Sequence, residues 1–338
     1  MTEAMKGKKN SILLESTEIK GYVFSNRYVC APFDIAKAEN NGIITEELLT
    51  IYGSRVGPSL IIVEQAAVAK AGQYRERLIF TDRDECINGL EKLANVIHQN
   101  NQVAVMQINH AGSAADISLT GLEAVAPSAV IHPTVKRSMP RALTVLEIKE
   151  IKEAFIQAAL RVKEAGFDGV EIHNCHGFLL SQFLSPLTNK RSDEYGGSLD
   201  NRSRLLLEIV KGVRKAVGEE FLLLVRLGLD DFLSGGMTAE DGCLVAEKLQ
   251  EAGIDILDIS TGLMSPLSLP GPAMLRELLK KAKAHVTIPV IGAGALENIE
   301  IAADMVEKEE VDFIALARKI MKQPNYVEEL LETINTKV

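Results

Sequence analysis

The chain of 338 residues has no tryptophan, few other aromatic residues (5%) and only four cysteines. The cysteines, Cys30, Cys86, Cys175 and Cys243, stand far apart, and no two of them form a Cys-x-x-Cys pair. Iron–sulfur clusters and structural zinc sites take their ligands from such closely spaced pairs. The sequence therefore predicts free thiols, no iron–sulfur cluster and no metal site.

Positive charge and long apolar runs are also scarce. The sequence has 37 Lys and Arg against 46 Asp and Glu, a net charge of −9, and no basic stripe of the kind that binds nucleic acid. No apolar run reaches the roughly 20 residues of a membrane span, and the first residues lack the apolar core of a signal peptide. We therefore expect a cytoplasmic protein that binds a small-molecule substrate and neither nucleic acid nor membranes.

Short, nearly continuous apolar runs rich in Val, Ile and Leu recur along the chain. Such runs are typical of parallel strands that are buried on both faces. The expected strands are Arg27–Phe33, Leu60–Val68, Val103–Ile108, Gly169–Ile172, Phe221–Leu227, Ile254–Ser260, Pro289–Gly292 and Phe313–Ala317.

A helical pattern follows each run. In Thr144–Ala165 the apolar residues form one stripe, Thr144 and Glu147 have the spacing of a capping box, and Gly166 ends the helix. The other expected helices are Thr45–Tyr52, Asp84–Gln99, Asn201–Val217, Thr238–Ala252, Pro272–Ala284, Asn298–Glu307 and Lys319–Ile334. This alternation predicts an α/β fold, a closed (β/α)8 TIM barrel in a single domain over residues 1–338, with residues 1–10 flexible. A doubly wound open sheet is the alternative.

Two segments fall outside the alternation. Ser11–Ser25 resembles a small hairpin, which we expect to cap the bottom of the barrel. Ala111–Leu143 is a long polar connection with three prolines that leaves the C-terminal end of the third strand. Because barrel enzymes build their active sites at that end, we expect this connection to form a lid or a pocket wall.

His173 and His176 directly follow the fourth expected strand. At the mouth of a barrel, two imidazole N–H groups can converge on one carbonyl or nitro oxygen and stabilise negative charge that develops there. Two other interpretations remain open for an isolated His-x-x-His pair. One histidine can simply hydrogen-bond its own loop, or the pair can bind a metal, which requires a third ligand that the sequence does not identify.

The surrounding residues carry a resemblance to a known family. The matching residues are His173, His176, Gly177, Phe183, Leu184, Ser185, Pro186, Asn189, Arg191, Asp193, Glu194, Tyr195, Gly196, Gly197, Asn201 and Arg202. This run closely resembles the signature of old yellow enzyme-type ene-reductases, and the resemblance extends in order from Asn26 to about Pro324. It implies that His173 and His176 grip the electron-withdrawing oxygen of a substrate. We interpret Asn201 and Arg202 as structural.

The resemblance also implies non-covalent FMN and places its contacts. The expected flavin-binding residues are Ala31, Pro32 and Phe33 at the end of the first strand, with Gln65, Gln107 and Arg226. Gln107 offers both a donor and an acceptor to the pyrimidine edge, and Arg226 places a cation near N1 and C2=O. A lone arginine inside a barrel can instead form an internal ion pair.

The phosphate site is expected at the last two strands. Gly292 and Gly294 end the seventh strand, and Ala317 and Arg318 end the eighth. Backbone N–H groups and Arg318 there would form the phosphate site that is common in this fold. Gly-Ala-Gly alone is weak evidence for FMN, because many barrels bind sugar phosphates in the same way.

The chain departs from the family pattern at several positions. Phe178 replaces the tyrosine that usually gives a proton to the substrate carbon. Asp34 replaces the usual Thr or Cys beside flavin N5; an ionised carboxylate would oppose flavin reduction, whereas a neutral one could donate a hydrogen bond or a proton. Gln65 stands where a small residue is usual, and Ser113 replaces a common arginine.

The function expected from the resemblance is hydride transfer from NADH or NADPH, through FMN, to an electron-poor acceptor such as an α,β-unsaturated carbonyl. Because Phe178 cannot donate a proton, a nitro or quinone reductase or a demethylase-like oxidation is the first alternative. A phosphate-binding barrel lyase or isomerase without flavin, and a catalytically silent flavin-binding protein, are the others. We expect a stand-alone barrel without an iron–sulfur or pyridine-nucleotide domain, and a dimer or tetramer by family habit.

Overall fold

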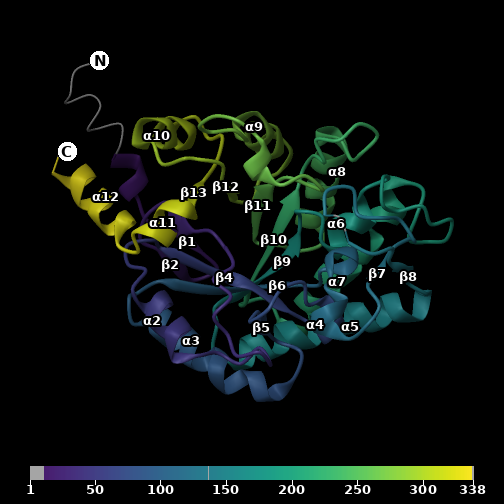
Figure 1. Ribbon diagram of the computed structural model, residues 1–338. Helices are drawn as coiled ribbons and strands as arrows, with labels where there is room; N and C mark the ends of the chain where they lie inside the picture. The colour runs from purple at the N-terminus through teal and green to yellow at the C-terminus, as the bar shows by residue number, and fades with distance from the viewer. Residues whose placement is uncertain (1–10, 136, 337–338) are drawn as a thin grey trace.

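A computed structural model describes residues 11–135 and 137–336. Its main sheet closes on itself in the order β3-β13-β12-β11-β10-β9-β6-β4, because β3 also pairs with β4 (Figure 1). All of these pairs are parallel. The predicted (β/α)8 barrel is therefore confirmed, and the open sheet is wrong. The flexibility predicted for residues 1–10 lies outside the described residues.

The strands of the ring are short and buried along their whole length, as the apolar runs predict. They are β3 (Tyr28–Cys30), β4 (Leu60–Ala67), β6 (Val103–Asn109), β9 (Gly169–Asn174), β10 (Leu222–Gly228), β11 (Ile256–Ser260), β12 (Val290–Gly292) and β13 (Phe313–Leu316). A short strand, β5 (Ile79–Phe80), pairs with the end of β4 outside the ring.

Helices follow the strands and cover the outer face of the barrel, where their apolar stripes pack against the strands. The α-helices are α2 (Glu46–Gly53), α3 (Ile87–His98), α4 (Ile117–Thr120), α5 (Val145–Glu164), α6 (Leu179–Leu184), α7 (Leu199–Val217), α8 (Ala239–Glu251), α9 (Arg276–His285), α10 (Ile299–Glu307), α11 (Arg318–Lys322) and α12 (Tyr326–Asn335). Short 3-10 turns are η1 (Ser11–Leu14), η2 (Lys70–Gly72), η3 (Asp84–Cys86), η4 (Gly112–Ala114) and η5 (Pro266–Ser268).

Several element bounds differ from those expected. The first strand ends at Cys30, so the three residues after it belong to the mouth of the barrel rather than to the sheet. The C-terminal helix is divided into α11 and α12 around Pro324, because proline lacks the N–H that a continuous helix needs. Helix α6 was missed, since a turn and a half of helix has too little periodicity to be recognised.

The predicted capping box of α5 is present. The Thr144 hydroxyl accepts from the backbone N–H of Glu147 at 3.2 Å, and the Glu147 carboxylate accepts from the backbone N–H of Thr144 at 2.8 Å. Gly166 follows the helix with a φ of 81°, in the left-handed region that glycine adopts without strain.

The predicted hairpin is formed by β1 (Thr17–Ile19) and β2 (Tyr22–Phe24), which pair antiparallel. Phe24 packs its ring 5.2 Å from that of Phe313, and its side chain joins the apolar cluster inside the barrel. The hairpin therefore closes the N-terminal end of the barrel.

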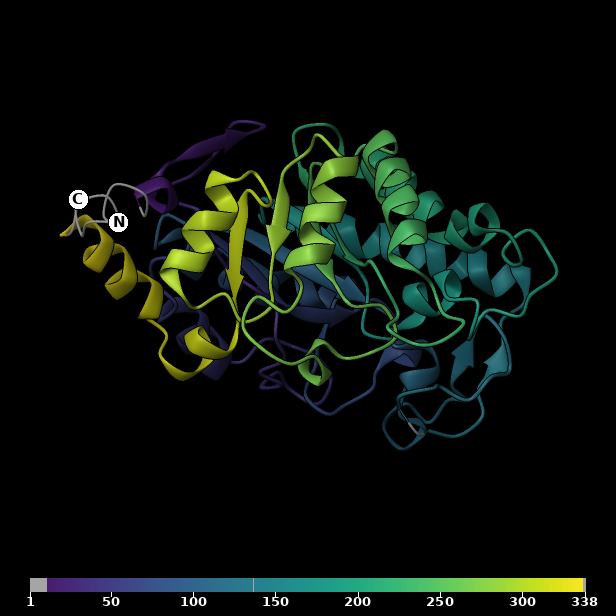
Figure 2. The same cartoon turned by 90° about the horizontal axis from the view of Figure 1, so that it is seen from above.

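The long connection lies at the opposite end from the hairpin, as the view in Figure 2 shows. It contains η4, α4 and two short strands, β7 (Val125–Ala126) and β8 (Arg141–Ala142), which pair in parallel. Arg191 fastens it to the barrel by donating to the carbonyl oxygens of Pro127 and Leu143 at 2.9 and 2.6 Å. The connection is thus placed where a lid or pocket wall was expected.

Candidate active site

Polar side chains gather where the C-terminal ends of the strands meet. Strand β9 carries His173, and the turn after it carries His176 and Gly177 with φ values of 56° and 73°. Gly177 cannot be replaced cheaply, because a Cβ there would lie 2.4 Å from Nε2 of His132. His132, from the long connection, donates through this nitrogen to the carbonyl oxygen of Gly177 at 2.7 Å. The connection is therefore fastened to the turn that holds the histidine pair.

The two histidines face each other, with ring centroids 5.3 Å apart. His173 is buried, and neither of its ring nitrogens has a hydrogen-bond partner among the described residues. Nε2 of His176 lies 2.7 Å from the hydroxyl of Ser260. Burial holds the pKa of His173 well below its ordinary value and, with the positive charge of Arg226, lowers the pKa of His176 to about 3. Both imidazoles are therefore neutral near pH 7, and each can donate one N–H.

A layer of polar side chains crosses the barrel beneath the histidines. Gln107 donates through Nε2 to Oε1 of Glu171 at 2.7 Å, and Nε of Arg226 lies 3.2 Å from Oδ2 of Asp258. Burial and the neighbouring Asp258 raise the pKa of Glu171, and burial raises the pKa of Asp258 against the pull of Arg226. Arg226 thus forms with Asp258 the internal ion pair that the sequence left open, and its charge partly offsets the rise in the pKa of Glu171.

A second polar group lies at the ends of β3 and β4. The amide of Gln65 donates to Oδ1 of Asp34 at 3.2 Å and to the hydroxyl of Tyr74 at 2.9 Å. Burial raises the pKa of Asp34, although Gln65 and Arg75 favour the ionised form. This direction agrees with the neutral alternative for Asp34 that the sequence left open.

The residues after β3 separate into two environments. Ala31 lines a hollow in the mouth, and the half-buried Pro32 follows it. Phe33 packs beneath the guanidinium of Arg55 at 4.3 Å, and the ring of Tyr52 lies 4.2 Å from the same group. Because Arg55 is fully enclosed, this stack of cation and rings fixes the chain as it leaves the first strand.

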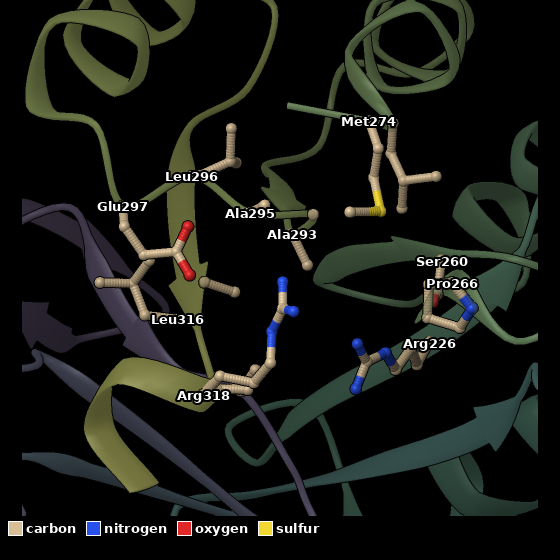
Figure 3. Close-up of a pocket in the computed structure, with 15 residues that line it drawn as sticks. Arg226, Ser260, Pro266, Met274, Ala293, Ala295, Leu296, Glu297, Leu316 and Arg318 are labelled. Atoms are coloured by element: carbon tan, nitrogen blue, oxygen red, sulfur yellow. The ribbon is translucent and has the colours of Figure 1, made fainter. Parts of the chain in front are cut away.

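The hollow lies between the ends of β10, β12 and β13. Its empty space is about 620 Å³ when the open mouth is included. The residues that line it include Ala31, Arg226, Ser260, Met274, Gly294, Glu297, Ala317 and Arg318. Figure 3 shows the guanidinium of Arg318 pointing toward Ala293 and Ala295, and that of Arg226 turned toward Arg318.

Gly292, which was expected beside the phosphate, does not line this hollow. It lies within β12, and a Cβ there would meet Val311 at 2.7 Å and Leu279 at 3.0 Å. Its smallness therefore serves the packing of the strand against its neighbours. Gly294, with a φ of 114°, is the glycine that opens the backbone toward the hollow.

Most other residues of the signature hydrogen-bond within the segment that runs from α6 to the start of α7 and do not line the mouth. Asn189 donates to the carbonyl oxygens of Phe183 and Tyr195, both at 2.7 Å. Arg202 donates to those of Leu184 and Gly197 at 2.7 and 2.6 Å, as its structural interpretation predicts.

One group of side chains could hold a metal ion. Ligand atoms of His173, Cys175 and His176 all lie within 4.8 Å of one another. Cys175 is buried, and burial raises the pKa of its thiol, which opposes the thiolate that a metal requires. The absence of a metal therefore stays a prediction, and these three residues are where a bound metal would contradict it.

Three residues of the mouth were missed by sequence reasoning: Ser260, His132 and Tyr74. Ser260 ends β11, a position at which polar residues of a barrel point to the site, so its place in the strand was an available signal. His132 and Tyr74 lie in loops, where no periodicity indicates the direction of a side chain. Phe178 lies beside the histidine pair, with its ring centroid 5.1 Å from that of His173.

Within the described residues, the search for helices both long enough and apolar enough to span a membrane found none.

Comparisons with known proteins agree with this geometry. The chain is 36% identical over 324 residues to the NADH oxidase of Thermoanaerobacter brockii, covering 93% of this chain and 50% of that protein. A complex of 2-naphthoyl-CoA reductase with 2-naphthoyl-CoA has a TM-score of 0.91 at 27% identity, over 96% of this chain and 52% of that one. Morphinone reductase in complex with tetrahydroNAD has a TM-score of 0.83 at 25% identity, over 95% and 91%.

The chain thus spans about half the length of the first two of these relatives. The model of one family, described as NADH:flavin oxidoreductase / NADH oxidase, matches residues 13–337, which is nearly the whole sequence. The resemblance found in the signature residues is therefore confirmed, and the chain belongs to the NADH:flavin oxidoreductase / NADH oxidase family.

Proposed function

We propose that this barrel binds FMN and takes part in NADH- or NADPH-dependent reduction of an electron-poor acceptor, with an α,β-unsaturated carbonyl as the first candidate. The observation that carries the proposal is the state of His173. It is a buried imidazole with two unpartnered ring nitrogens at the mouth of the barrel, beside a second neutral imidazole. An unsatisfied buried donor is costly, so a ligand oxygen is the partner that this pair lacks.

The residues of the mouth fit FMN. Arg318 is exposed in the hollow and can meet a phosphate dianion beside the backbone at Gly294. Arg226 and Gln107 come from neighbouring parts of the polar layer and can meet the pyrimidine edge. The apolar lining of Ala31 and Met274 suits a flat ring. When bound, FMN would supply the chemistry of accepting hydride from a nicotinamide and passing it to the acceptor.

The chain's own contribution is to bind and polarise the acceptor. Each neutral imidazole of His173 and His176 donates one N–H toward the activating oxygen of the acceptor, where negative charge develops as hydride arrives. Ser260 holds the ring of His176 in place at 2.7 Å. His132 and Gln182 both donate to the carbonyl oxygen of Gly177, at 2.7 and 2.6 Å, and so hold the turn between the histidines and the lid.

A second candidate reaction is favoured by Phe178. Reduction of a quinone or a nitro group places protons on oxygen or nitrogen. Such protons can come from water, so the protein needs no acid that protonates carbon. A side chain without a hydroxyl at position 178 therefore fits such a reaction, or a demethylase-like oxidation, without any other proton donor to carbon.

The test begins with the visible spectrum of the purified protein after addition of FMN. Anaerobic titration with NADH and NADPH, followed by cyclohexenone, a quinone and a nitro ester, then separates the candidates. Bleaching by a nicotinamide and reoxidation by the enone is the expected result. A colourless protein that cannot be reconstituted would favour the phosphate-binding lyase or isomerase, and photoreduction without turnover of any acceptor would favour a silent flavoprotein. Sedimentation of the same sample tests the proposed dimer or tetramer.

A further inference from the structure

A tyrosine outside the family signature lies near the histidine pair, across the ring of Phe178. Tyr74 follows η2 in the loop after β4, and its ring centroid lies 5.0 Å from that of Phe178. The ring of Phe178 in turn lies 5.1 Å from that of His173. The three rings therefore form a row, and Tyr74 brings a phenol hydroxyl to the neighbourhood from which Phe178 removes one.

The hydroxyl of Tyr74 is part of an ordered hydrogen-bond group. It donates to Oδ2 of Asp34 and accepts from Nε2 of Gln65 at 2.9 Å. The same nitrogen of Gln65 donates to Oδ1 of Asp34 at 3.2 Å. Asn109 donates to Oε1 of Gln65, which turns the amide nitrogen of Gln65 toward the pair. Gln65 and Asp34 are also two of the positions at which the chain departs from the family pattern.

Asp34 connects this hydroxyl to solvent. Its side chain is 18% exposed, and the guanidinium of Arg75 lies 3.6 Å from Oδ2. Burial raises the pKa of the neighbouring Glu64 as well, and the charge of Asp34 raises it further. Arg137 approaches from the lid, where it donates to the carbonyl oxygen of Tyr74 at 3.3 Å. The charge of Arg137 is taken up by Asp116, with which it forms an ion pair.

We propose that Tyr74 is the proton donor to the acceptor carbon and that Asp34 resupplies its proton, in place of the tyrosine that related enzymes carry at position 178. The inference rests on the proposed reduction of an activated alkene. The O–H bond of Tyr74 breaks, and a C–H bond forms at the carbon next to the activating group, while the neighbouring carbon receives the hydride that originates from NADH or NADPH. In the resting arrangement Tyr74 donates to Asp34, so this hydrogen bond reverses in the step: the Tyr74 hydroxyl turns to the acceptor and the protonated Asp34 donates to the Tyr74 oxygen. The phenolate then takes the proton of the Asp34 carboxyl group, and solvent reprotonates Asp34.

The decisive variant is Tyr74→Phe, which keeps the ring contact with Phe178 and removes only the hydroxyl. General acid catalysis contributes about 100-fold to 10,000-fold, so we expect turnover of cyclohexenone to fall at least about 100-fold. Turnover of a quinone, whose protons go to oxygen, should stay within about twofold. The matched control is Tyr22→Phe in the hairpin at the far end of the barrel, which should leave both reactions unchanged.

Rescue separates a proton donor from a residue that only supports the loop. In Tyr74→Phe/Phe178→Tyr the hydroxyl returns on the adjacent ring, and we expect much of the enone turnover to return with it. Asp34→Asn keeps the size of the side chain but cannot pass a proton, so it should slow the enone reaction and spare the quinone reaction. A Tyr74→Phe enzyme that reduces cyclohexenone within threefold of wild type would overturn the proposal.

A measurement without catalysis tests the Tyr74–Asp34 pair directly. In FMN-free protein with 13Cζ-labelled tyrosine, the resonance that disappears in Tyr74→Phe belongs to Tyr74. It should shift as Asp34 titrates in wild type and lose this step in Asp34→Asn. Arg75→Gln should move the step to higher pH, because a cation that favours the ionised carboxylate has been removed. A Tyr74 resonance that is indifferent to Asp34→Asn would refute the relay.

The outcomes also distinguish the two proposals. A wild-type protein that turns over neither acceptor with NADH or NADPH would overturn the proposed function, and the proton-donor role with it. A protein that reduces both acceptors, with the enone reaction insensitive to Tyr74→Phe, would leave the proposed function standing and remove Tyr74 from it.

Discussion

Burial decides the chemistry of single side chains at the mouth. It keeps His173 and His176 uncharged, so their N–H groups act as neutral donors rather than as counterions. The same burial raises the pKa of Asp34, which favours a carboxyl group that still holds its proton. The two neutral imidazoles thus offer hydrogen-bond donors without adding positive charge beside Arg226.

The first prediction concerns the histidine pair. In His173→Ala/His176→Ala, FMN should remain bound, because the residues that fit it lie elsewhere in the mouth, while affinity for phenols and enones should fall about 10-fold to 100-fold for the loss of two hydrogen bonds. Titration of the flavin spectrum with a phenol measures this. His285→Ala, whose ring pairs with Glu247 on the surface, is the control. Equal phenol affinity in the double variant would remove both residues from the ligand site.

The residues of the site could be predicted to different extents. His173, His176 and Arg318 could be placed from the sequence because they lie at or just after the end of an easily recognised strand, whereas Arg226, within its strand, was assigned from the family resemblance. Tyr74 and His132 were not, because they lie in loops whose course depends on contacts with distant segments. The partner of Asp34 is 40 positions away in the chain, and no local spacing indicates such a contact.

At the scale of the element, helix α5 depends on the charge at its first turn. The carboxylate of Glu147 accepts from the backbone N–H and the hydroxyl of Thr144, both at 2.8 Å, and pairs with Arg141. These bonds lower the pKa of Glu147 to about 2 from an ordinary 4.5. The start of the longest helix is thus held by one acidic side chain.

The second prediction is that Glu147→Gln lowers the free energy of unfolding by about 1 kcal/mol at pH 7, the usual value of a helix cap. Urea unfolding measures the loss. Glu150→Gln, on the exposed face of the same helix, should cost much less.

The third prediction follows from the sign of this shift. Because the folded pKa of Glu147 is depressed, its contribution is complete above the unfolded value of 4.5 and is lost as pH falls toward about 2. The difference in stability between wild type and Glu147→Gln should therefore be largest near pH 7 and shrink to less than half by about pH 3. A difference that does not change with pH would show that the ionised carboxylate is not the source of the effect.

The elements differ in how far the sequence specified them. The start and end of α5 were predicted from Thr144, Glu147 and Gly166, since each acts through bonds to its own turn. The division between α11 and α12 was not, although Pro324 was visible, because the apolar pattern continues across it. Local signals fix helix ends well, whereas competition between two local signals is settled by packing.

At the scale of the whole molecule, the barrel is closed at one end and open at the other. The hairpin fills the N-terminal end with Phe24 and its neighbours, whereas the C-terminal end holds the hollow between β10, β12 and β13. The residues that line the hollow range from Ala31, after the first strand of the ring, to Arg318, after the last. A ligand there contacts segments from near both ends of the described chain.

The fourth prediction uses this arrangement. FMN at about 100 times its dissociation constant should stabilise the fold by about 2.7 kcal/mol and raise Tm by several degrees. Riboflavin, which lacks the phosphate, should raise Tm less. In Arg318→Ala the two ligands should become alike, because the guanidinium that meets the phosphate is gone. Equal shifts for FMN and riboflavin in the wild-type protein would refute a phosphate site at Arg318, and differential scanning fluorimetry distinguishes these cases.

The left-handed backbone at His176 has a consequence for variation in this enzyme. At a φ of 56°, β-branched and bulky side chains are strained, whereas Asn, Asp and Gly are accommodated with little cost. Few residue types are therefore compatible with the backbone at position 176 in variants made to change acceptor preference. Asparagine is the replacement that keeps both the turn and a hydrogen-bond donor. Valine or isoleucine would strain the turn that the long connection contacts, in addition to any effect on the acceptor.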